Sequence, residues 1–318
     1  MTTMSRPSIA SALETWFKTA ARAMPWRKRP TPYGCWLSEI MLQQTTYATA
    51  LPYYTRFIKA FPTVGRLAAA REEDVLKAWE GLGYYARARN LHKAAKILAV
   101  TRPIAWPKSA EAWARLPGVG PYTAAALSSV LSKERVPVVD GNVARVFSRV
   151  WRLDDDFHQA PARERLAARL KPEIVHAEEP GNFNQAMMEL GALVCTPTSP
   201  NCDVCPLAAH CAAFKAHEIE AYPAKPRARE RPTRARTVVL ARDEKGRVLL
   251  VKNEEGSLLK GLWDLPTVEE AGIATQVFSH FRLRQTVLRA SLRRLSFCDP
   301  SRVPLTKAAR EALRFDTM

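Results

Sequence analysis

The chain has 318 residues, 47% of them hydrophobic, which is enough for two domains that each bury a core. Its 48 lysines and arginines against 31 aspartates and glutamates give a net charge of +17. This charge favours a polyanionic partner, with nucleic acid as the first candidate; the alternative is a basic surface that is only solvated. It holds no apolar run of transmembrane length, and its first residues lack the apolar core of a secretory signal, so we expect a cytosolic protein that does not bind membranes.

The first two thirds of the chain predict helices. From residue 11 to about residue 220, apolar residues recur three or four positions apart, as in Trp36–Met41 and Leu91–Leu98, and strand-like alternation is missing. The first helix is expected to begin after Ser11. This part of the chain therefore predicts an all-helical domain.

Glu39 is a carboxylate inside the apolar helix pattern of residues 36–42. Charged groups are rarely buried unless they are paired or functional. Desolvation would raise the pKa of this carboxyl and make it a general acid at neutral pH. The alternative is that Glu39 lies on the exposed side of its helix or in a structural ion pair.

Two further segments have polar chemistry between helical patterns. Leu116–Gly120 reads LPGVG, and its two glycines can present backbone N–H groups to a phosphate at a helix N-terminus, although a simple helix–helix turn explains them too. Asp140 follows an apolar run and precedes a helix, where an ordinary N-cap is the alternative to a functional carboxylate.

Four of the six cysteines lie close together with the spacing C-x6-C-x2-C-x5-C, at Cys195, Cys202, Cys205 and Cys211. Four thiolates on an irregular loop suit a cubane iron–sulfur cluster. A zinc site, with His210 as a further candidate ligand, and plain buried thiols are the alternatives that the spacing leaves open.

The composition changes near residue 222. The run from Tyr222 to Arg236 is basic and proline-rich, which is typical of a linker. Beyond it, residues 236–241 and 247–252 predict two strands of a hairpin with its turn at Asp243–Gly246, and residues 307–315 predict a final helix. The sequence thus predicts a small second domain of α+β class.

Together, LPGVG, the later VDGN and the cysteine spacing resemble the helix-hairpin-helix DNA glycosylases with an iron–sulfur cluster. Within them the chain is most similar to the adenine DNA glycosylases of the MutY family, over residues 12 to 225. The strings that carry the resemblance are PW at 25–26, WLSEIMLQQT at 36–45, GLGYYARARNLH at 81–92, LPGVGPYTAAA at 116–126, VDGNVARV at 139–146 and FNQAMMELGALVCT at 183–196. It implies a [4Fe-4S] cluster on the four clustered cysteines.

The resemblance also implies the catalytic roles. Glu39 falls on the acid that protonates the adenine and then helps to activate water. Asp140 falls on the carboxylate that stabilises the positively charged sugar, with a transient covalent bond as a variant of the same role, and Asn142 falls on a residue that holds this pair. Two carboxylates around a glycosidic carbon is also the arrangement of sugar hydrolases.

Other positions match residues that contact DNA in the family. An adenine flipped out of the duplex would lie in a pocket lined by Trp26, Arg27, Leu42 and Gln185. Gln44 and Tyr84 match residues that fill or wedge the base stack beside the partner base. The hairpin would contact the phosphates through Leu116, Gly118, Val119 and Gly120.

Tyr122 stands where related glycosylase-lyases carry a lysine that forms a Schiff base with the sugar. Tyrosine has no amine and cannot form one. The resemblance therefore implies a monofunctional hydrolase with little or no strand-cleaving activity, and Tyr122 belongs to the expected catalytic set.

The C-terminal part resembles, more weakly, the MutT-like (NUDIX-like) domain of the same family, through GLWDLP at 261–266 and FSHFRL at 278–283. In the family the FSH loop reads 8-oxoguanine opposite the adenine, which implies this role for Phe278, Ser279 and His280; an ordinary hairpin turn is the alternative. The glutamate-rich metal box of nucleotide-hydrolysing relatives is missing, and the domain is shorter than is usual.

The sequence thus predicts a mostly α helix-hairpin-helix glycosylase domain (1–222), a linker (223–236) and a MutT-like domain (237–318). We expect a monomer that removes adenine opposite 8-oxoguanine or guanine in double-stranded DNA, nucleoid-associated if the source is bacterial. The rivals are a glycosylase of the same fold specific for thymine or oxidised pyrimidines, and a non-catalytic DNA-binding protein that uses the cluster for structure or redox sensing.

Overall fold

The computed structural model describes residues 7–224, 237–254, 259–277, 282–290 and 295–314. The chain divides into two compact units, of which the first combines residues 1–44 with 97–229 and the second combines residues 45–96 with 230–318. The predicted domain limits at residues 222 and 237 stay a prediction.

The first unit is helical throughout its described residues. Its α-helices are α1 (Ile9–Ala20), α2 (Pro25–Lys28), α3 (Pro32–Leu42), α8 (Ala110–Ala114), α9 (Pro121–Ser132), α10 (Gly141–Trp151), α11 (Ala160–Val175), α12 (Pro180–Leu193) and α13 (Ala212–Lys215). The expectation that the first helix begins after Ser11 is wrong: it begins at Ile9, because the Ser8 hydroxyl accepts a hydrogen bond from the Ser11 N–H at 3.1 Å and caps it.

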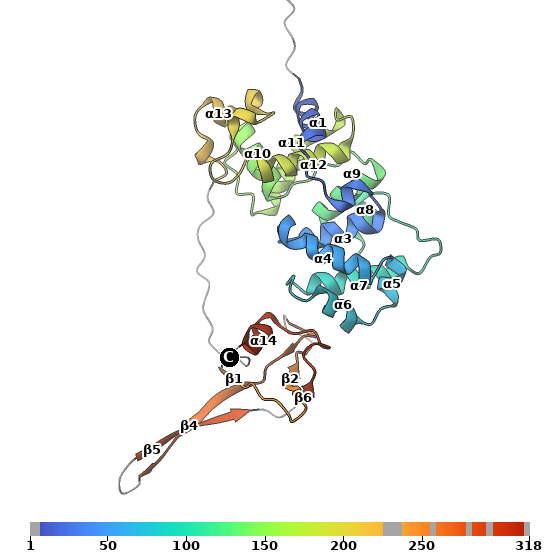
Figure 1. Cartoon of the computed structure of the whole chain (residues 1–318). Helices are drawn as coiled ribbons and strands as arrows, with labels where there is room; N and C mark the ends of the chain where they lie inside the picture. The colour runs from blue at the N-terminus through green and yellow to red at the C-terminus, as the bar shows by residue number, and fades with distance from the viewer. Residues whose placement is uncertain (1–6, 225–236, 255–258, 278–281, 291–294, 315–318) are drawn as a thin grey trace, which may run out of the picture. The chain divides into compact units, whose positions relative to one another are not determined.

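Helix α12 lies at the centre of this unit, where it packs against α1, α9, α10 and α11 (Figure 1). The core between these helices is apolar, and its fully buried side chains include Leu13, Phe147, Leu170, Phe183 and Leu190. Close packing of these buried side chains fixes the helices relative to one another. The polar residues described below are therefore held on a rigid frame.

The second unit begins with four helices, α4 (Tyr47–Ala60), α5 (Val64–Ala69), α6 (Glu72–Trp79) and α7 (Ala86–Leu98). Glu80, at the end of α6, joins them to the C-terminal residues of the same unit: its carboxylate pairs with Arg310 at 3.0 Å. The Tyr85 hydroxyl also donates to the Leu305 carbonyl at 3.3 Å.

The strands of the chain's described residues all lie in the C-terminal part of the second unit. They form two antiparallel three-stranded sheets, in the orders β1-β4-β5 and β3-β2-β6. The strands are β1 (Thr237–Val238), β2 (Val248–Lys252), β3 (Trp263–Asp264), β4 (Thr267–Val277), β5 (Arg282–Ala290) and β6 (Leu295–Cys298), followed by helix α14 (Lys307–Ala312). Val248, Leu250, Leu265, Leu305 and Ala309 form a small core beneath them.

The predictions for this region are confirmed in part. The turn at Asp243–Gly246 is present, with the Gly246 N–H donating to the Asp243 carbonyl at 2.9 Å, and α14 is the predicted final helix. The predicted hairpin is wrong for β1, which pairs with β4 instead. Next to the turn the two predicted segments do bond to each other: the Asp243 N–H donates to the Arg247 carbonyl at 3.0 Å, the Leu249 N–H donates to the Ala241 carbonyl at 2.8 Å, and Arg242 bridges to Val248. Together the units form a mostly helical protein with a small C-terminal α+β region.

Within the part of the chain that the structure describes, no helix combines the length and the apolar character needed to cross a membrane.

Candidate active site and metal centre

Glu39 lies in the last turns of helix α3, which is otherwise buried in the core. The helix begins where the Thr31 hydroxyl accepts from the Gly34 N–H at 3.0 Å. Glu39 itself is half-buried, and burial, followed by the nearby charge of Asp140, raises the pKa of its carboxyl from 4.5 to about 7. The charge of Arg27 acts in the opposite direction. Glu39 is therefore not on an exposed helix face, and a proton is available on it near neutral pH.

Tyr122 lies in the first turn of α9 and meets Glu39 from the facing helix. Its hydroxyl hydrogen-bonds the Glu39 carboxyl and lies 3.0 Å from the sulfur of Met188. Burial and the two neighbouring carboxylates, Glu39 and Asp140, raise the pKa of this phenol well above its usual value. Tyr122 thus stays protonated; its hydroxyl donates to the Met188 sulfur, so its oxygen is left to accept a hydrogen bond from the protonated Glu39 carboxyl.

Asp140 is the N-cap of helix α10, as one of the two interpretations of this residue predicted. Its Oδ1 accepts from the Val143 N–H at 2.7 Å and its Oδ2 accepts from the Asn142 side-chain amide at 3.0 Å. Burial raises the pKa of Asp140, and these hydrogen bonds oppose the rise. The cap also fixes the carboxylate in one orientation beside Glu39.

Asn142 is held in turn by Arg145, a residue that the sequence did not single out. An Nη2–H of Arg145 donates to Asn142 Oδ1 and to the Gly191 carbonyl, each at 2.8 Å. Its Nε–H donates to the carbonyl of Cys195, also at 2.8 Å. A chain of hydrogen bonds therefore joins Asp140 to the first of the clustered cysteines.

Gly191 explains how α12 comes so close to this group. A Cβ atom at this position would lie 2.6 Å from the Cβ of Asn142, a distance that real side chains do not reach. Only a glycine permits the contact. The local string ELGA is the signal that could have identified this close approach.

The four residues predicted for the base pocket are placed on three helices. Trp26 on α2 is buried, and Leu42 at the end of α3 is half-buried. Arg27 and Gln185 contact each other: the Arg27 Nε–H donates to Gln185 Oε1 at 2.7 Å. The structure therefore brings together helices α2 and α12 at this point.

Glu189, one turn after Gln185 on α12, is a buried carboxylate that the sequence analysis missed. Arg22 pairs with it through Nε at 2.7 Å and Nη2 at 2.9 Å, and Arg27 reaches it at 3.2 Å. Hydrogen bonds from the two arginines outweigh burial and lower the pKa of Glu189 to about 2. Glu189 is therefore ionised at neutral pH.

The predicted hairpin lies between α8 and α9. Leu116 and Val119 are buried, and the Val119 N–H donates to the Leu116 carbonyl at 3.1 Å. Gly118 has a φ of +79°, in the region that favours glycine, and Gly120 caps α9 with its own backbone exposed. Gln43, missed by the sequence analysis, donates to Thr123 at 3.1 Å and so ties the end of α3 to the hairpin.

Gln44 and Tyr84 both have left-handed backbones, with φ of +56° and +50°. Such angles are uncommon for residues other than glycine and recur at functional sites. Both residues are exposed, and 62% of Tyr84 is accessible. They belong to different units, Gln44 to the first and Tyr84 to the second. Phe278, Ser279 and His280 lie outside the described residues.

A cavity of about 1130 Å³ opens beside Asp140 in the first unit. Its lining includes Asp140, Tyr122 and Gly141 together with the polar side chains of Arg145, His158 and Arg163, but not Glu39. The carboxylate and the phenol of the site therefore face open space, which a substrate needs in order to reach them.

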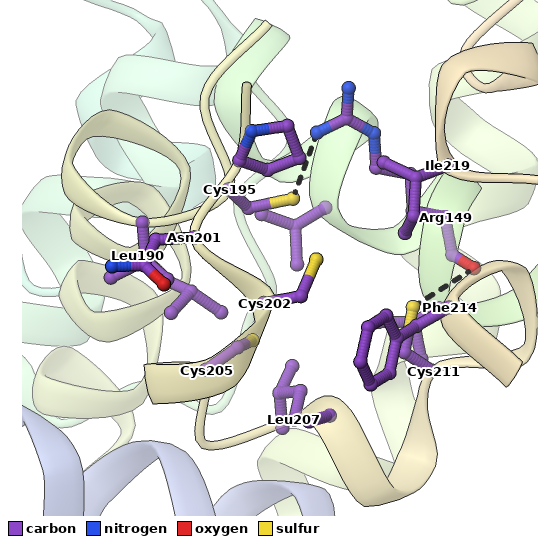
Figure 2. Close-up of a pocket in the computed structure, with 15 residues that line it drawn as sticks. Arg149, Leu190, Cys195, Asn201, Cys202, Cys205, Leu207, Cys211, Phe214 and Ile219 are labelled. Atoms are coloured by element: carbon purple, nitrogen blue, oxygen red, sulfur yellow. Dashed lines mark hydrogen bonds between the residues drawn. The ribbon is translucent and has the colours of Figure 1, made fainter. Parts of the chain in front are cut away.

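The four clustered cysteines line a second cavity, together with apolar side chains that include Val146, Leu190 and Phe214. Figure 2 shows their side chains directed into this shared space from one continuous loop. Among the described residues, no three histidine, cysteine or acidic side chains form a group that could hold a single metal ion; a four-iron cluster takes its thiolates on separate irons and does not need such a group. His210 is not part of the cavity; its Nε2 lies 2.9 Å from the Pro7 carbonyl.

The donor set fits an iron–sulfur cluster. An Nη1–H of Arg149, which is buried, donates to Cys195 Sγ at 3.3 Å, and Cys211 Sγ lies 3.5 Å from the Arg149 carbonyl (Figure 2). Burial raises the pKa of the Cys205 thiol to about 12, and a bound metal would offset this cost by stabilising the thiolate. Four sulfur ligands around an apolar cavity, with a cation beside one of them, suit a cubane cluster.

Comparison with protein families agrees with this chemistry. Residues 37–173 match the HhH-GPD superfamily of base excision DNA repair proteins, and residues 195–211 match the iron–sulfur binding domain of endonuclease III. Residues 37–173 thus have the fold of the HhH-GPD superfamily and residues 195–211 form an iron–sulfur binding loop, so the predicted fold class and [4Fe-4S] cofactor are confirmed.

Curated relatives define the family more narrowly. The chain is 36% identical to an adenine DNA glycosylase of Arabidopsis thaliana, over 84% of this chain and 49% of the relative. It is 36% identical to one of Schizosaccharomyces pombe, over 83% and 64%, and 33% identical to one of Buchnera aphidicola from Acyrthosiphon pisum, over 83% and 75%. The chain belongs to the adenine DNA glycosylase family, although it spans only about half to two thirds of the first two relatives.

Solved structures show the same fold. A thermostable thymine-DNA glycosylase matches with a TM-score of 0.58 and 24% identity, over 65% of this chain and 95% of that one. A trapped endonuclease III–DNA covalent intermediate matches with a TM-score of 0.53 and 24% identity, over 64% and 93%.

Proposed function

We propose that this protein removes adenine mispaired with 8-oxoguanine or guanine in double-stranded DNA by hydrolysing the N-glycosidic bond. The observation that carries the proposal is the pairing of a protonated Glu39, hydrogen-bonded by Tyr122, with a fixed Asp140 beside it. We infer that the excised base is adenine because the relatives are adenine DNA glycosylases.

In the first step, the Glu39 carboxyl donates its proton to the flipped adenine while the bond between the base nitrogen and the sugar C1′ breaks. The electron pair of that bond leaves with the base, so protonation makes adenine a better leaving group. A carboxyl with a pKa of about 7 is protonated in about half of the molecules at pH 7, so a proton donor is available when the substrate binds.

In the second step, the Asp140 carboxylate stabilises the positive charge left on the sugar, and water attacks C1′. The ionised Glu39 accepts a proton from that water and returns to its starting state. Asp140 is suited to the role because Val143 and Asn142 hold it in place before any substrate arrives.

The [4Fe-4S] cluster, when bound, supplies four iron–thiolate bonds that close the loop of Cys195, Cys202, Cys205 and Cys211. Arg145 and Arg149 connect this loop to helix α10 and thus to Asp140. These residues position the carboxylate and exchange no proton with the substrate.

The reaction is proposed to stop at an abasic site. Tyr122 faces Glu39 where the lyase branch of this fold carries its lysine, and a phenol cannot form a Schiff base with the sugar. The product strand therefore remains intact until it is treated with alkali.

DNA binding, the lesion-reading role of Phe278, Ser279 and His280, the monomeric state and a cytosolic or nucleoid location belong to the same proposal. The hairpin is suited to phosphates because Gly118 and Gly120 are exposed at the start of α9. The net charge of +17 favours association with DNA.

The test is single-turnover release of adenine from a duplex with one adenine opposite 8-oxoguanine, with and without alkali before the gel. We expect alkali-dependent cleavage at the adenine. Cleavage at a thymine placed in the same duplex context would support the pyrimidine-specific rival, and tight binding without release of any base would support the non-catalytic one.

A further inference from the structure

Arg22, Arg27 and Glu189 form a buried ion-pair cluster, in which Arg27 belongs to the predicted base pocket and Arg22 and Glu189 do not. Its acidic member is 2% exposed and lies on α12, whereas both arginines come from the segment between α1 and α3, more than 160 positions away in the chain. Desolvating such a group is costly, and hydrophobic residues often replace it without loss of stability. Its place beside the base pocket therefore suggests a functional use.

We infer that Glu189 is a positioning residue that, by gripping Arg27, holds the Gln185 amide in the one orientation that matches adenine and keeps the Arg27 charge directed away from Glu39. The inference rests on the proposed function, because it concerns how the same pocket recognises its base. Glu189 was not among the residues predicted for the base pocket, and its proposed role is to position Arg27 and Gln185 within it.

The first step is the fixing of Arg27. Its Nη1 lies 3.2 Å from Glu189 Oε1 and 3.3 Å from the Arg22 carbonyl, and its Nη2 lies 3.3 Å from Glu189 Oε2. One face of the guanidinium also rests on the Phe17 ring, 5.2 Å from its centre. A planar guanidinium with both terminal nitrogens bound can aim its Nε–H in only one direction.

The second step is the fixing of Gln185. The Arg27 Nε–H, at 2.7 Å, can be accepted only by the amide oxygen, and the amide nitrogen donates to the Gly181 carbonyl at 3.2 Å. The amide therefore cannot rotate by half a turn. It keeps one acceptor lone pair and one N–H available side by side.

An acceptor beside a donor complements adenine. The amino group at position 6 of adenine donates and its N7 accepts, which is the pattern that a glutamine amide pairs with twice. A 6-oxopurine such as hypoxanthine has an acceptor at both places, so one of them would face the fixed amide oxygen of Gln185. The lock on this amide thus favours adenine over 6-oxopurines.

The third step concerns Glu39. The titratable and charged groups that face it are Arg27 from α2, Cys35 from its own helix, Tyr122 from α9 and Asp140 at the start of α10. Burial keeps the Cys35 thiol neutral, with a pKa of about 12. Arg27 is the cation of this set, and Glu189 on α12 balances its charge and binds its terminal nitrogens.

The test compares Glu189→Gln, Glu189→Asp and the control Glu178→Gln in the full-length protein, each checked for its melting temperature and iron content. Glu178 forms an ion pair with Lys18 at the surface of the same unit, with 74% of its side chain exposed. Two quantities are measured: the ratio of single-turnover rates on adenine and on hypoxanthine opposite 8-oxoguanine, and the pH at which the adenine rate falls by half on the alkaline side.

For Glu189→Gln we expect the adenine-to-hypoxanthine ratio to fall by about 10-fold, within the discrimination that a bidentate amide–base pair provides. We expect the half-rate pH to move down by about one unit, because Arg27 is no longer neutralised and acts on Glu39. Glu189→Asp keeps the charge and should keep the half-rate pH, and Glu178→Gln should match the wild type in both quantities.

A folded, iron-loaded Glu189→Gln protein with the wild-type ratio and half-rate pH would overturn the inference, since a merely structural residue changes only the active fraction. If that variant does not fold, Arg27→Lys decides: it keeps the cation but loses the fork, so the ratio should fall while the half-rate pH stays, and an unchanged ratio overturns the inference. A wild-type protein that releases no adenine would instead defeat the proposed function itself.

Discussion

Two glutamates of the first unit, Glu39 on α3 and Glu189 on α12, have carboxyl pKa values shifted in opposite directions. Glu189 is gripped by Arg22 and Arg27, and the pKa of its carboxyl falls to about 2. Burial and the charge of Asp140 raise the pKa of the Glu39 carboxyl to about 7, against the opposing effects of the Arg27 charge and the Tyr122 hydroxyl. Burial is common to both, so the partners decide whether a buried carboxyl serves as a fixed anion or as a proton donor.

The difference shows how one arginine serves both sites. The terminal nitrogens of Arg27 bind Glu189 and its Nε–H binds Gln185. Its charge therefore lowers the pKa of Glu39 only in part. If Arg27 paired directly with Glu39, that carboxyl would ionise and lose its proton-donating role.

Replacing the proton donor should abolish the reaction. We expect Glu39→Gln to keep duplex binding and to lower the single-turnover rate of adenine release by at least ~100-fold, because an amide has no proton to donate. A binding titration beside the rate measurement separates the two. Release within a few-fold of the wild-type rate would show that another group is the acid.

Replacing Asp140 should separate its two roles. Asparagine caps a helix about as well as aspartate, so Asp140→Asn should keep the melting temperature of the protein. It should lower the rate of adenine release by about 100-fold, since the charge that stabilises the sugar is gone. Loss of stability without loss of rate would leave the cap as the sole role of this residue.

Glu189 should stabilise the fold in a pH-dependent way. We expect Glu189→Gln to lower the free energy of unfolding by about 3 kcal/mol at pH 7, at the low end for a buried pair because a third of the Arg22 side chain is exposed. Because folding lowers the pKa of Glu189 from 4.5 to about 2, this contribution is full above pH 4.5 and is lost as the pH falls towards 2. Urea unfolding at several pH values measures it, and a difference that persists at pH 2 would contradict it.

Glu39 should show the reverse slope. Folding raises its pKa from 4.5 to about 7, so the unfolded chain ionises first and stability is lost as the pH rises through this window. Glu39→Gln should therefore melt a few degrees higher than the wild type, about 2–4 °C, at pH 8 and at about the same temperature at pH 4.5. Equal melting temperatures at pH 8 would mean that Glu39 is not destabilised by ionisation.

The smallest effect belongs to a surface pair. Glu178→Gln removes an ion pair with Lys18 in which 63% and 74% of the two side chains are exposed. We expect its free energy of unfolding to change by less than about 0.5 kcal/mol at pH 7, because solvent screens the pair. A loss as large as that of Glu189→Gln would show that burial is not what distinguishes the two pairs.

Much of this site could be predicted from the sequence, because its signals are local. The cysteine spacing, the glycines of the hairpin and the carboxylate within an apolar helix each lie on a short string of residues. The cap formed by Asp140 was also a local expectation, and it holds.

The remaining contacts join distant parts of the chain. Glu189 meets Arg22 across 167 positions, and Arg145 meets Cys195 across 50, so spacing alone could not identify either pair. The strand β1 was assigned to its neighbour along the chain but pairs with β4 instead, because sheet partners depend on which edges are free. Tertiary packing decides these features.

The protonation state of Glu39 is the most direct test of this account. Carbon-13 NMR of protein labelled at the glutamate side-chain carboxyls, with Glu39→Gln as the reference that assigns the signal, reports its titration in the absence of substrate. We predict a midpoint near pH 7, the value to which burial and Asp140 raise this carboxyl. A midpoint near 4.5, the ordinary value for glutamate, would contradict the assignment of Glu39 as the proton donor.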